Sequence, residues 1–248
     1  MKHRVAICLS GLVGNSKGKS HDHEDDDSKV LELSIPHWNF FTSNYECDYF
    51  IHTWSGHLKQ DIINGLKPVD IITQDQPSFD IPKYVPGSFE RKHAHWCRWF
   101  SIKESVRLKQ EHEEKNNIRY DSVIVSRFDL AWAKQIDFKY LDMNKMWLPR
   151  WFENGNLVDP INYKCKDYWF LSSSKNIDKF SSLYDSLNTY TKTGACRINT
   201  AMGVSSHYLA AYHIKNLGIE VGHVLEARDN FLNCDFPVIR FKYFSANI

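Results

Sequence analysis

The chain has 248 residues, enough for one large domain with a substantial apolar core. Its 31 Lys and Arg residues nearly balance its 30 Asp and Glu residues, so it lacks the basic excess typical of nucleic-acid binding, and we expect no nucleic-acid partner. The six cysteines form no Cys-x-x-Cys pair, which argues against a zinc module or a disulfide framework and fits a reducing compartment.

The N-terminal segment has only part of the pattern of a secretion signal. Basic residues at positions 2–4 precede an apolar run, but residues 15–19 offer no small-x-small cleavage site. No apolar stretch approaches the ~18 residues that a membrane span needs. We therefore expect a cytoplasmic protein without a transmembrane segment.

The first predicted element is a strand over residues 5–9, whose continuous apolar run is typical of a buried parallel strand. The loop behind it contains Gly-Lys-Ser at residues 18–20, the end of a phosphate-binding P-loop. That motif requires glycine where this sequence has Val13. The acidic run at residues 22–27 would also repel a phosphate. We therefore predict that residues 15–28 form a mobile loop that does not wrap a phosphate.

Strands and helices alternate after this loop. Residues 47–54 and 69–73 are predicted strands, separated by a helix over residues 58–66 that ends before Pro68. Residues 74–90 contain three prolines and a glycine, which predicts a loop.

The longest predicted helix covers residues 93–117, because Trp96, Trp99 and Val106 fall on one face at helical spacing. It is followed by a predicted strand over residues 120–132.

Shorter patterns fill the remainder of the chain. Strands are expected at residues 146–151 and 168–172, helices at residues 177–190 and 200–217, and irregular β-structure at residues 220–244.

This alternation predicts a single α/β domain: a Rossmann-type α/β/α sandwich with a mostly parallel central sheet. The apolar runs at residues 5–9, 50–53 and 123–125 are expected to be neighbouring inner strands of that sheet. We see no internal repeat and no linker that would divide the chain.

Ligands of open α/β sheets bind beyond the carboxyl ends of the strands. The residues at these positions are Ser10 and Gly11, then His52, Thr53 and Trp54, then Ser126, Arg127, Phe128 and Asp129. Arg127 and Asp129 lie two apart, so an extended chain directs both to one face. An arginine fork suits a diphosphate, and a neighbouring carboxylate suits Mg²⁺, Mn²⁺ or a ribose hydroxyl. The competing interpretation is an Arg127–Asp129 ion pair that closes the end of the sheet.

Five short segments, in this order, resemble a family of small GT-A-like glycosyltransferases from bacterial surface-polysaccharide clusters and viruses. The segments are RVAICLSG, CDYFIHTW, WFSIKES, YDSVIVSRFDLAW and DYWFLSSS. The resemblance implies a nucleotide-sugar donor and a glycan or other hydroxyl acceptor. It also implies a donor-binding half over residues 1–132 and an acceptor half over residues 133–248.

In this resemblance, Arg127-Phe128-Asp129 stands where GT-A enzymes carry Asp-x-Asp, whose two carboxylates hold a divalent cation against the donor diphosphate. The chain keeps Asp129, which the resemblance implies as a catalytic residue and a ligand of Mn²⁺ or Mg²⁺. Arg127 replaces the first acid and is expected to take over part of the role of the metal. Relatives carry an arginine soon after Ser-Gly, where this chain has Lys17 and Lys19.

Three further predictions concern single residues, each with a structural alternative. Asp167 is the candidate general base of an inverting transfer, or else a turn or capping residue. His52 lines the donor cleft, or else is a strand-end histidine whose hydrogen bonds are satisfied within the fold. Trp147 and Trp151 form an acceptor platform, or else pack in the core.

The histidines elsewhere are weaker candidates. His93 and His95 are interpreted as surface residues. His21 and His23 suggest metal binding only through a short His/Asp tract, which is a weak compositional signal.

Two other functions remain open. The altered Asp-x-Asp position also fits a binding protein of the same fold without catalysis. A P-loop phosphotransferase or sulfotransferase is motivated by residues 18–20 alone.

Overall fold

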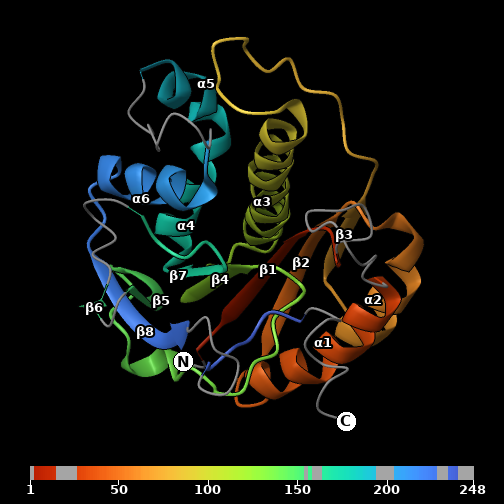
Figure 1. Ribbon diagram of the computed structural model, residues 1–248. Helices are drawn as coiled ribbons and strands as arrows, with labels where there is room; N and C mark the ends of the chain where they lie inside the picture. Colours follow the sequence, from red (N-terminus) through yellow and green to blue (C-terminus); the bar gives the residue numbers. More distant parts are fainter. Residues whose placement is uncertain are drawn as a thin grey trace.

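The structure is a computed structural model that describes residues 3–14, 27–153, 156–157, 164–193, 204–227 and 234–239. Its centre is a sheet with the strand order β3-β2-β1-β4-β7-β5-β6, and β8 pairs with β5 (Figure 1). The strands are β1 (Val5–Gly11), β2 (Cys47–Thr53), β3 (Asp70–Thr73), β4 (Ser122–Ser126), β5 (Met146–Glu153), β6 (Asn156–Leu157), β7 (Trp169–Ser172) and β8 (Val221–Ala227). The helices are α1 (Asp27–Thr42), α2 (Lys59–Leu66), α3 (Phe89–Asn116), α4 (Ser174–Ser181), α5 (Leu183–Thr193) and α6 (Ser206–Asn216), with short 3-10 turns at Gly56–Leu58 and Phe138–Tyr140.

The first four strands form a parallel sheet of Rossmann type. β1 pairs with β2 on one side and with β4 on the other, and β3 lies beyond β2. The chain builds outward from β1 to β3 and then returns through α3 to β4, so the strand order reverses between β1 and β4. The prediction of an α/β fold with a mostly parallel central sheet is confirmed, and so is the placement of the three apolar runs as neighbouring inner strands.

The second half extends this sheet with a different geometry. β7 runs antiparallel to β4, β5 runs antiparallel to β7, and β8 is parallel to β5. Parallel pairing therefore predominates in the first half, and mixed pairing follows after β4.

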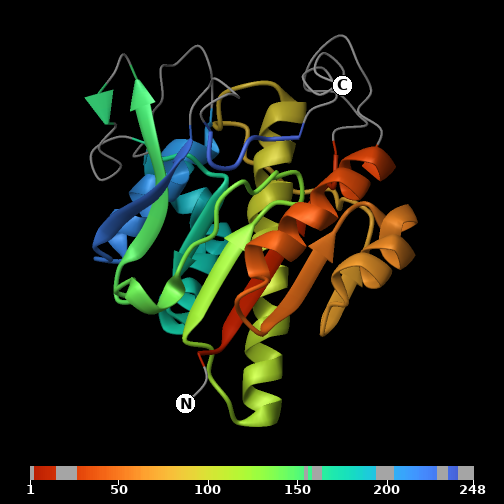
Figure 2. The same cartoon turned by 90° about the horizontal axis from the view of Figure 1, so that it is seen from below.

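Helices cover both faces of the sheet (Figures 1 and 2). On one face, α1 and α2 pack against β1 and β2 in a core that contains Trp38, Phe41 and Trp132. On the other face, α3 to α6 pack in a core that contains Trp99 and Phe180. The three tryptophans named here are each at most 1 % exposed, so part of the high tryptophan content fills the two cores. No helix in the described part of the chain is long and apolar enough to cross a bilayer.

One helix, α1, was absent from the sequence prediction. It contains Pro36, which removes a backbone donor from the helix interior and masks the helical pattern. It also begins at Asp27, so Asp27 and Ser28 are helical and the predicted mobile loop was too long at that end. The remaining loop positions, residues 15–26, lie outside the described residues.

Several element boundaries also differ from the prediction. β4 ends at Ser126, and the chain bends at Phe128 instead of continuing as a strand to residue 132. The helix predicted at residues 177–190 is two helices, α4 and α5. The long helix α3 begins earlier, at Phe89, because Ser88 accepts a hydrogen bond from the amide of Arg91 and caps it.

Candidate functional site

The ends of β1 and β4 meet where the strand order reverses. The Ser10 hydroxyl, at the end of β1, donates to the carbonyl of Ser126 at the end of β4 (3.4 Å). Gly11 has a φ of +99°, a conformation that favours glycine, and a Cβ added there would meet nothing within 4 Å. Among the described residues there is thus room for a methyl-sized group at Gly11, which lies at the strand ends where ligands of open α/β sheets usually bind.

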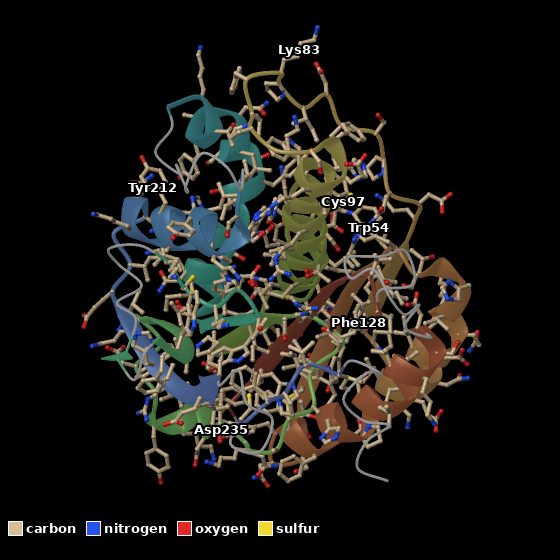
Figure 3. All side chains as sticks on the ribbon, in the orientation of Figure 1. Trp54, Lys83, Cys97, Phe128, Tyr212 and Asp235 are labelled. Atoms are coloured by element: carbon tan, nitrogen blue, oxygen red, sulfur yellow. The ribbon has the colours of Figure 1, made fainter. Side chains whose placement is uncertain are left out.

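The segment after β4 is fixed by two contacts. Phe128 (Figure 3) is fully buried in the core shared with α1. Its carbonyl accepts from the indole of Trp38 (3.2 Å). The carbonyl of Asp129 accepts from the amide of Ile239 (2.8 Å). The backbone on either side of Asp129 is thereby held, which restricts the directions that the neighbouring side chains can take.

Arg127 and Asp129 form a two-point ion pair. Arg127 Nε and Nη2 each donate to a carboxylate oxygen of Asp129 at 2.5 Å. Burial alone would lower the pKa of Arg127, but the charge of Asp129 and its hydrogen bonds raise the pKa above its ordinary value. The ion pair of the competing interpretation is therefore present. The Arg127 side chain nevertheless stays 26 % exposed, so part of it is accessible to a ligand.

A second ion pair lies beside the first. Arg98, on α3, places its Nε 3.2 Å from Oδ2 of Asp167, and its Nη2 donates to the Asp167 carbonyl. Burial would raise the pKa of Asp167, but the charges of Arg98, His207 and Arg127 outweigh burial and hold the pKa well below its usual range. We call Arg98, Arg127, Asp129, Asp167 and His207 the arginine cluster.

His207, in the first turn of α6, has a defined tautomer. Its Nδ1 lies 3.2 Å from Oδ1 of Asp167 and 2.9 Å from the carbonyl oxygen of Cys165. Both neighbours are acceptors, so Nδ1 must carry the proton. A neutral His207 then has its lone pair on Nε2, and the side chain is 35 % exposed. This is the arrangement of a histidine base that a carboxylate orients.

The three predicted residues at the end of β2 are directed elsewhere. His52 and Thr53 are fully buried and Trp54 is 8 % exposed. The Ser101 hydroxyl of α3 lies 2.7 Å from Nδ1 of His52 and accepts from the amide of Gly11 (2.8 Å). The hydrogen bonds of Ser101 thus connect β1, β2 and α3 behind Gly11. Their role in donor binding stays a prediction, and the structure gives each a packing role.

These contacts also perturb His52. Burial lowers the pKa of His52 to about 4, so the ring is neutral near pH 7. Thr53 donates to the carbonyl of Gly11 (2.8 Å), and Trp54 stacks on Phe100 with ring centroids 5.9 Å apart. The end of β2 thus supports the backbone of Gly11 from behind.

Lysines and aromatic rings continue from the arginine cluster toward β5. The guanidinium of Arg127 lies 5.7 Å from the ring centroid of Tyr168, and the ammonium of Lys166 lies 5.6 Å from the same centroid. Lys166 and Lys164 lie 4.4 and 4.6 Å from the centroid of Trp151. We call Trp151, Lys164 and Lys166 the Trp151 cluster.

The two tryptophans predicted as an acceptor platform differ in environment. Trp147 packs against the core and donates its indole N–H to the carbonyl of Asp142 (2.9 Å). Trp151 is 8 % exposed, and its indole N–H finds no acceptor among the described residues. Trp147 is therefore a packing residue in this structure, whereas the donor of Trp151 has no acceptor within the described ranges.

The described residues do not supply a metal site of the expected kind. Among them, no group of three or more His, Cys, Asp or Glu side chains is placed to hold an ion. Both carboxylate oxygens of Asp129 accept from Arg127. His21 and His23 lie outside the described residues, as do Lys17 and Lys19.

The sequence reasoning missed Arg98, His95 and His207. His95 was interpreted as a surface residue, but it is 9 % exposed and pairs with the Ser206 hydroxyl (2.8 Å). Arg98 had a usable signal, because it is a charged residue inside the aromatic run of residues 96–100, where charge is unexpected unless paired. His207 had none, since only the fold brings α6 beside Asp167.

Comparison with known proteins adds little to this geometry. No protein-family model matches the chain, and no curated protein matches it. Among solved structures it is similar to a Drosophila β-1,4-galactosyltransferase 7 mutant in complex with manganese, UDP-galactose and xylobiose. The similarity has a TM-score of 0.44 and 10 % identity, and it covers 98 % of this chain and 73 % of that chain. At these values neither fold nor function can be transferred.

Proposed function

We propose that the protein is a glycosyltransferase that moves a sugar from a nucleotide-sugar donor to a hydroxyl of a glycan or other acceptor. The observation that carries the proposal is that the partly exposed Arg127 and the end of β1 at Gly11 lie at the reversal of strand order. The resemblance of the five sequence segments supports the same function. Within the one domain, residues 1–132 would bind the donor and residues 133–248 the acceptor.

The donor diphosphate is assigned to Arg127 and Arg98. The exposed part of the Arg127 guanidinium offers hydrogen bonds in a fixed plane, which suits phosphate oxygens. Asp129 holds that plane in place through both carboxylate oxygens. Ser10 and Gly11 leave room for the nucleotide at the end of β1. His52, Thr53 and Trp54, which were predicted to line the donor cleft, would act on donor binding indirectly, with Thr53 holding the carbonyl of Gly11.

Charge stabilisation by arginine fits this site better than stabilisation by a metal. A leaving diphosphate needs positive charge, and preorganised charges supply it without reorganisation. Asp129 remains the single predicted carboxylate ligand for Mn²⁺ or Mg²⁺, and it is already paired with Arg127. We therefore expect transfer to persist in excess EDTA.

The acceptor hydroxyl is assigned to His207 and Asp167. An inverting transfer needs a base, and Nε2 of His207 is available for that proton. The pKa of Asp167 lies below its usual range, which makes its carboxylate a weak base but a good partner for the imidazolium that forms. We assign Asp167 to orienting His207. Replacing His207 with Gln should lower kcat without weakening donor binding, whereas His112→Gln on α3 should change neither.

The two alternative functions have different support. The closed Arg127–Asp129 pair is the observation that favours a binding protein without catalysis. The P-loop alternative rests on residues 18–20, which lie outside the described residues. Asp27 counts against this alternative. It is buried in the first turn of α1 and places a carboxylate at the helix end where a P-loop would bind phosphate.

A nucleotide-sugar screen separates these functions. UDP-, GDP- and CMP-sugars are tested by thermal unfolding and by sugar transfer, each with Mn²⁺ and with EDTA. A ligand at 100 times its Kd adds about 2.7 kcal/mol of stability. Arg127→Gln should abolish that gain, and Arg107→Gln, an exposed arginine on α3, should retain it. Stabilisation without transfer would favour the binding protein, and stabilisation by ATP alone the P-loop enzyme.

The cytoplasmic location belongs to the same proposal. Cys8, Cys47, Cys97, Cys165 and Cys234 are free thiols in the structure, as is usual for proteins of a reducing compartment.

A further inference from the structure

The first turn of α6 is held by contacts with other segments and not by a capping side chain. Ser205 stands at the N-cap position, but its side chain makes no capping hydrogen bond. Serine at that position usually accepts from an amide of the first turn. Instead, the Ser206 hydroxyl pairs with Nδ1 of His95 on α3 (2.8 Å), and the His207 carbonyl accepts from the amide of Cys165 (3.2 Å). The direction of the His207 side chain therefore depends on these two anchors.

The anchor on α3 is shielded from water. His95 is 9 % exposed and Ser206 is 5 % exposed. Separating them would leave buried polar groups without this hydrogen bond, which is costly. The pair therefore fixes the distance between α3 and the first turn of α6.

Five residues form a closed ring of contacts that begins and ends on α3. Arg98 contacts Asp167, and Asp167 contacts His207. Ser206, the neighbour of His207, contacts His95, which has i,i+3 spacing from Arg98 and so lies on the same face of α3. Without the contact between His95 and Ser206 the ring is open, and α6 is joined to it only through His207.

The contact between His207 and Asp167 tolerates little movement. Nδ1 and Oδ1 are 3.2 Å apart, at the long end of the hydrogen-bond range, and a further ~0.5 Å would break the contact. Nδ1 of His207 also lies 2.9 Å from the carbonyl oxygen of Cys165, so its tautomer would survive such a movement. The hold on the first turn of α6 therefore controls the pairing of His207 with Asp167.

We propose that His95 is a positioning residue for His207: by holding Ser206 it keeps the first turn of α6 against α3, and thereby keeps His207 within reach of Asp167. Its effect on sugar transfer rests on the proposed glycosyltransferase function. Its effect on the pairing of His207 with Asp167 rests only on these contacts.

The Nδ1 proton of His207 tests this pairing without requiring transfer. Its chemical shift, measured by NMR on protein with labelled histidine, moves downfield when a carboxylate accepts the proton, and Asp167→Asn supplies the unpaired reference. We expect His95→Leu to move the signal at least half of the way to that reference. Ser206→Ala should do the same, and it keeps the test valid if His95→Leu fails to fold. An unchanged signal in both variants would overturn the proposal.

Controls distinguish positioning from a general loss of structure. His95→Asn places an amide nitrogen near the position of Nδ1 and should leave the signal close to that of the wild type. His93→Leu is the matched control, since His93 is also on α3 but pairs with the carbonyl of Pro77 (2.8 Å). The Nε2 proton of His213, further along α6, donates to the carbonyl of Lys179 (3.4 Å) and should not respond to any of these variants. A matching change at His213 would mean that α6 as a whole is disturbed, and would overturn the proposal.

Initial rates of transfer measure the consequence for the proposed reaction. His95→Leu should lower kcat about tenfold to a hundredfold, because displacements of about 1 Å in an active site can lower a rate about a hundredfold. The KM of the donor should change little, and His95→Asn should retain most of the rate. The double variant His95→Leu/Ser206→Ala should be no slower than the slower single variant, because residues that act through one contact are not additive. Additive losses would overturn the proposal.

The outcomes separate this proposal from the glycosyltransferase itself. A moved His207 signal in His95→Leu, with no transfer by the wild type from any nucleotide sugar, would keep the positioning role and reject the glycosyltransferase. Transfer by the wild type, with the signal unchanged in His95→Leu and Ser206→Ala, would keep the glycosyltransferase and reject the positioning role.

Discussion

Helix α3 carries a charged cluster near each end, and the two clusters differ in how far their cations are buried. Near the C-terminal end of the helix, Lys109 donates to Glu113 (2.8 Å), Ser174 (2.6 Å) and Asp178 (2.5 Å). Arg119 pairs with the same two carboxylates. We call these five residues the Lys109 network. Two cations meet two carboxylates, and Lys109 is fully buried.

Near the N-terminal end, the arginine cluster pairs two arginines with two carboxylates and adds His207. The arginines and His207 are a quarter to a third exposed. Figure 2 shows why position matters, since α3 runs opposite to the first strands and its N-terminal part lies at their carboxyl ends. A buried network stabilises the fold, whereas arginine pairs that stay partly exposed at the ligand end of the sheet fit binding.

The largest effect is expected from breaking the balanced network. Lys109→Met leaves Glu113 and Asp178 without their buried partner and should lower the free energy of unfolding by about 3–5 kcal/mol. Urea unfolding measures this loss. Adding Glu113→Gln and Asp178→Asn should recover much of the loss. A loss under about 1 kcal/mol would show that the network is not structural.

The arginine cluster should respond in the opposite way. Asp129→Asn frees the Arg127 guanidinium, and loss of one preorganised group typically lowers the rate about 10²–10³-fold, or roughly 3–4 kcal/mol in the transition state. Initial rates of transfer measure it, and unfolding should change less than for Lys109→Met. Asp185→Asn removes an exposed pair with Lys103 and should leave transfer unchanged. Normal transfer by Asp129→Asn would reduce the Arg127–Asp129 pair to a structural contact.

A pH series tests the burial of two histidines, His52 and His213. Burial lowers the pKa of both His52 and His213 to about 4, below the ~6.5 of an unfolded histidine. As pH falls from 6.5 to 4 the unfolded chain takes up protons first, so each histidine should remove about 2–3 kcal/mol of stability. Chemical unfolding at several pH values checks this slope, and His213→Gln should remove about half of it. A flat profile over this range would contradict the burial of both rings.

The smallest effect compares two glycines, one beside the arginine cluster and one at the end of α6. Gly11 and Gly218 both have positive φ, and a Cβ added at either meets nothing within 4 Å. Alanine at each should cost about 1–2 kcal/mol of stability through backbone strain. Only Gly11→Ala should weaken nucleotide-sugar binding, measured by titration. Equal donor affinity in both variants would contradict the assignment of the donor site to Gly11.

The parallel half of the fold was predictable because its strands are buried on both faces. Residues 5–9 and 123–125 are uninterrupted apolar runs, and such runs determine both element type and position in the sheet. α1 was not predictable in this way, since Pro36 interrupts its pattern. The antiparallel β7 has the same apolar signal as a parallel strand, so its direction is set by tertiary pairing.

The site was predictable only where it lies close to strand ends in the sequence. Ser10, Gly11, Arg127 and Asp129 follow apolar runs directly, and two of them do meet, through the pair of Arg127 with Asp129. Arg98 and His207 come from helices, and their distances to Asp167 depend on how α3 and α6 cross the sheet. His52 shows the converse, because a strand-end position did not predict that Ser101 of α3 would cover it.

Helix α3 also has a mechanical consequence. Arg98 lies eleven residues before Lys109, about 16 Å along the helix axis at 1.5 Å per residue. Lys109 is fully buried and donates to three partners, so we expect any tilt of the helix to pivot near that end. A tilt of about 4° would displace Arg98 by about 1 Å, and displacements of that size in an active site can lower a rate about a hundredfold. The stiffness of a network at one end of the sheet thus limits the positional error of the arginine at the other.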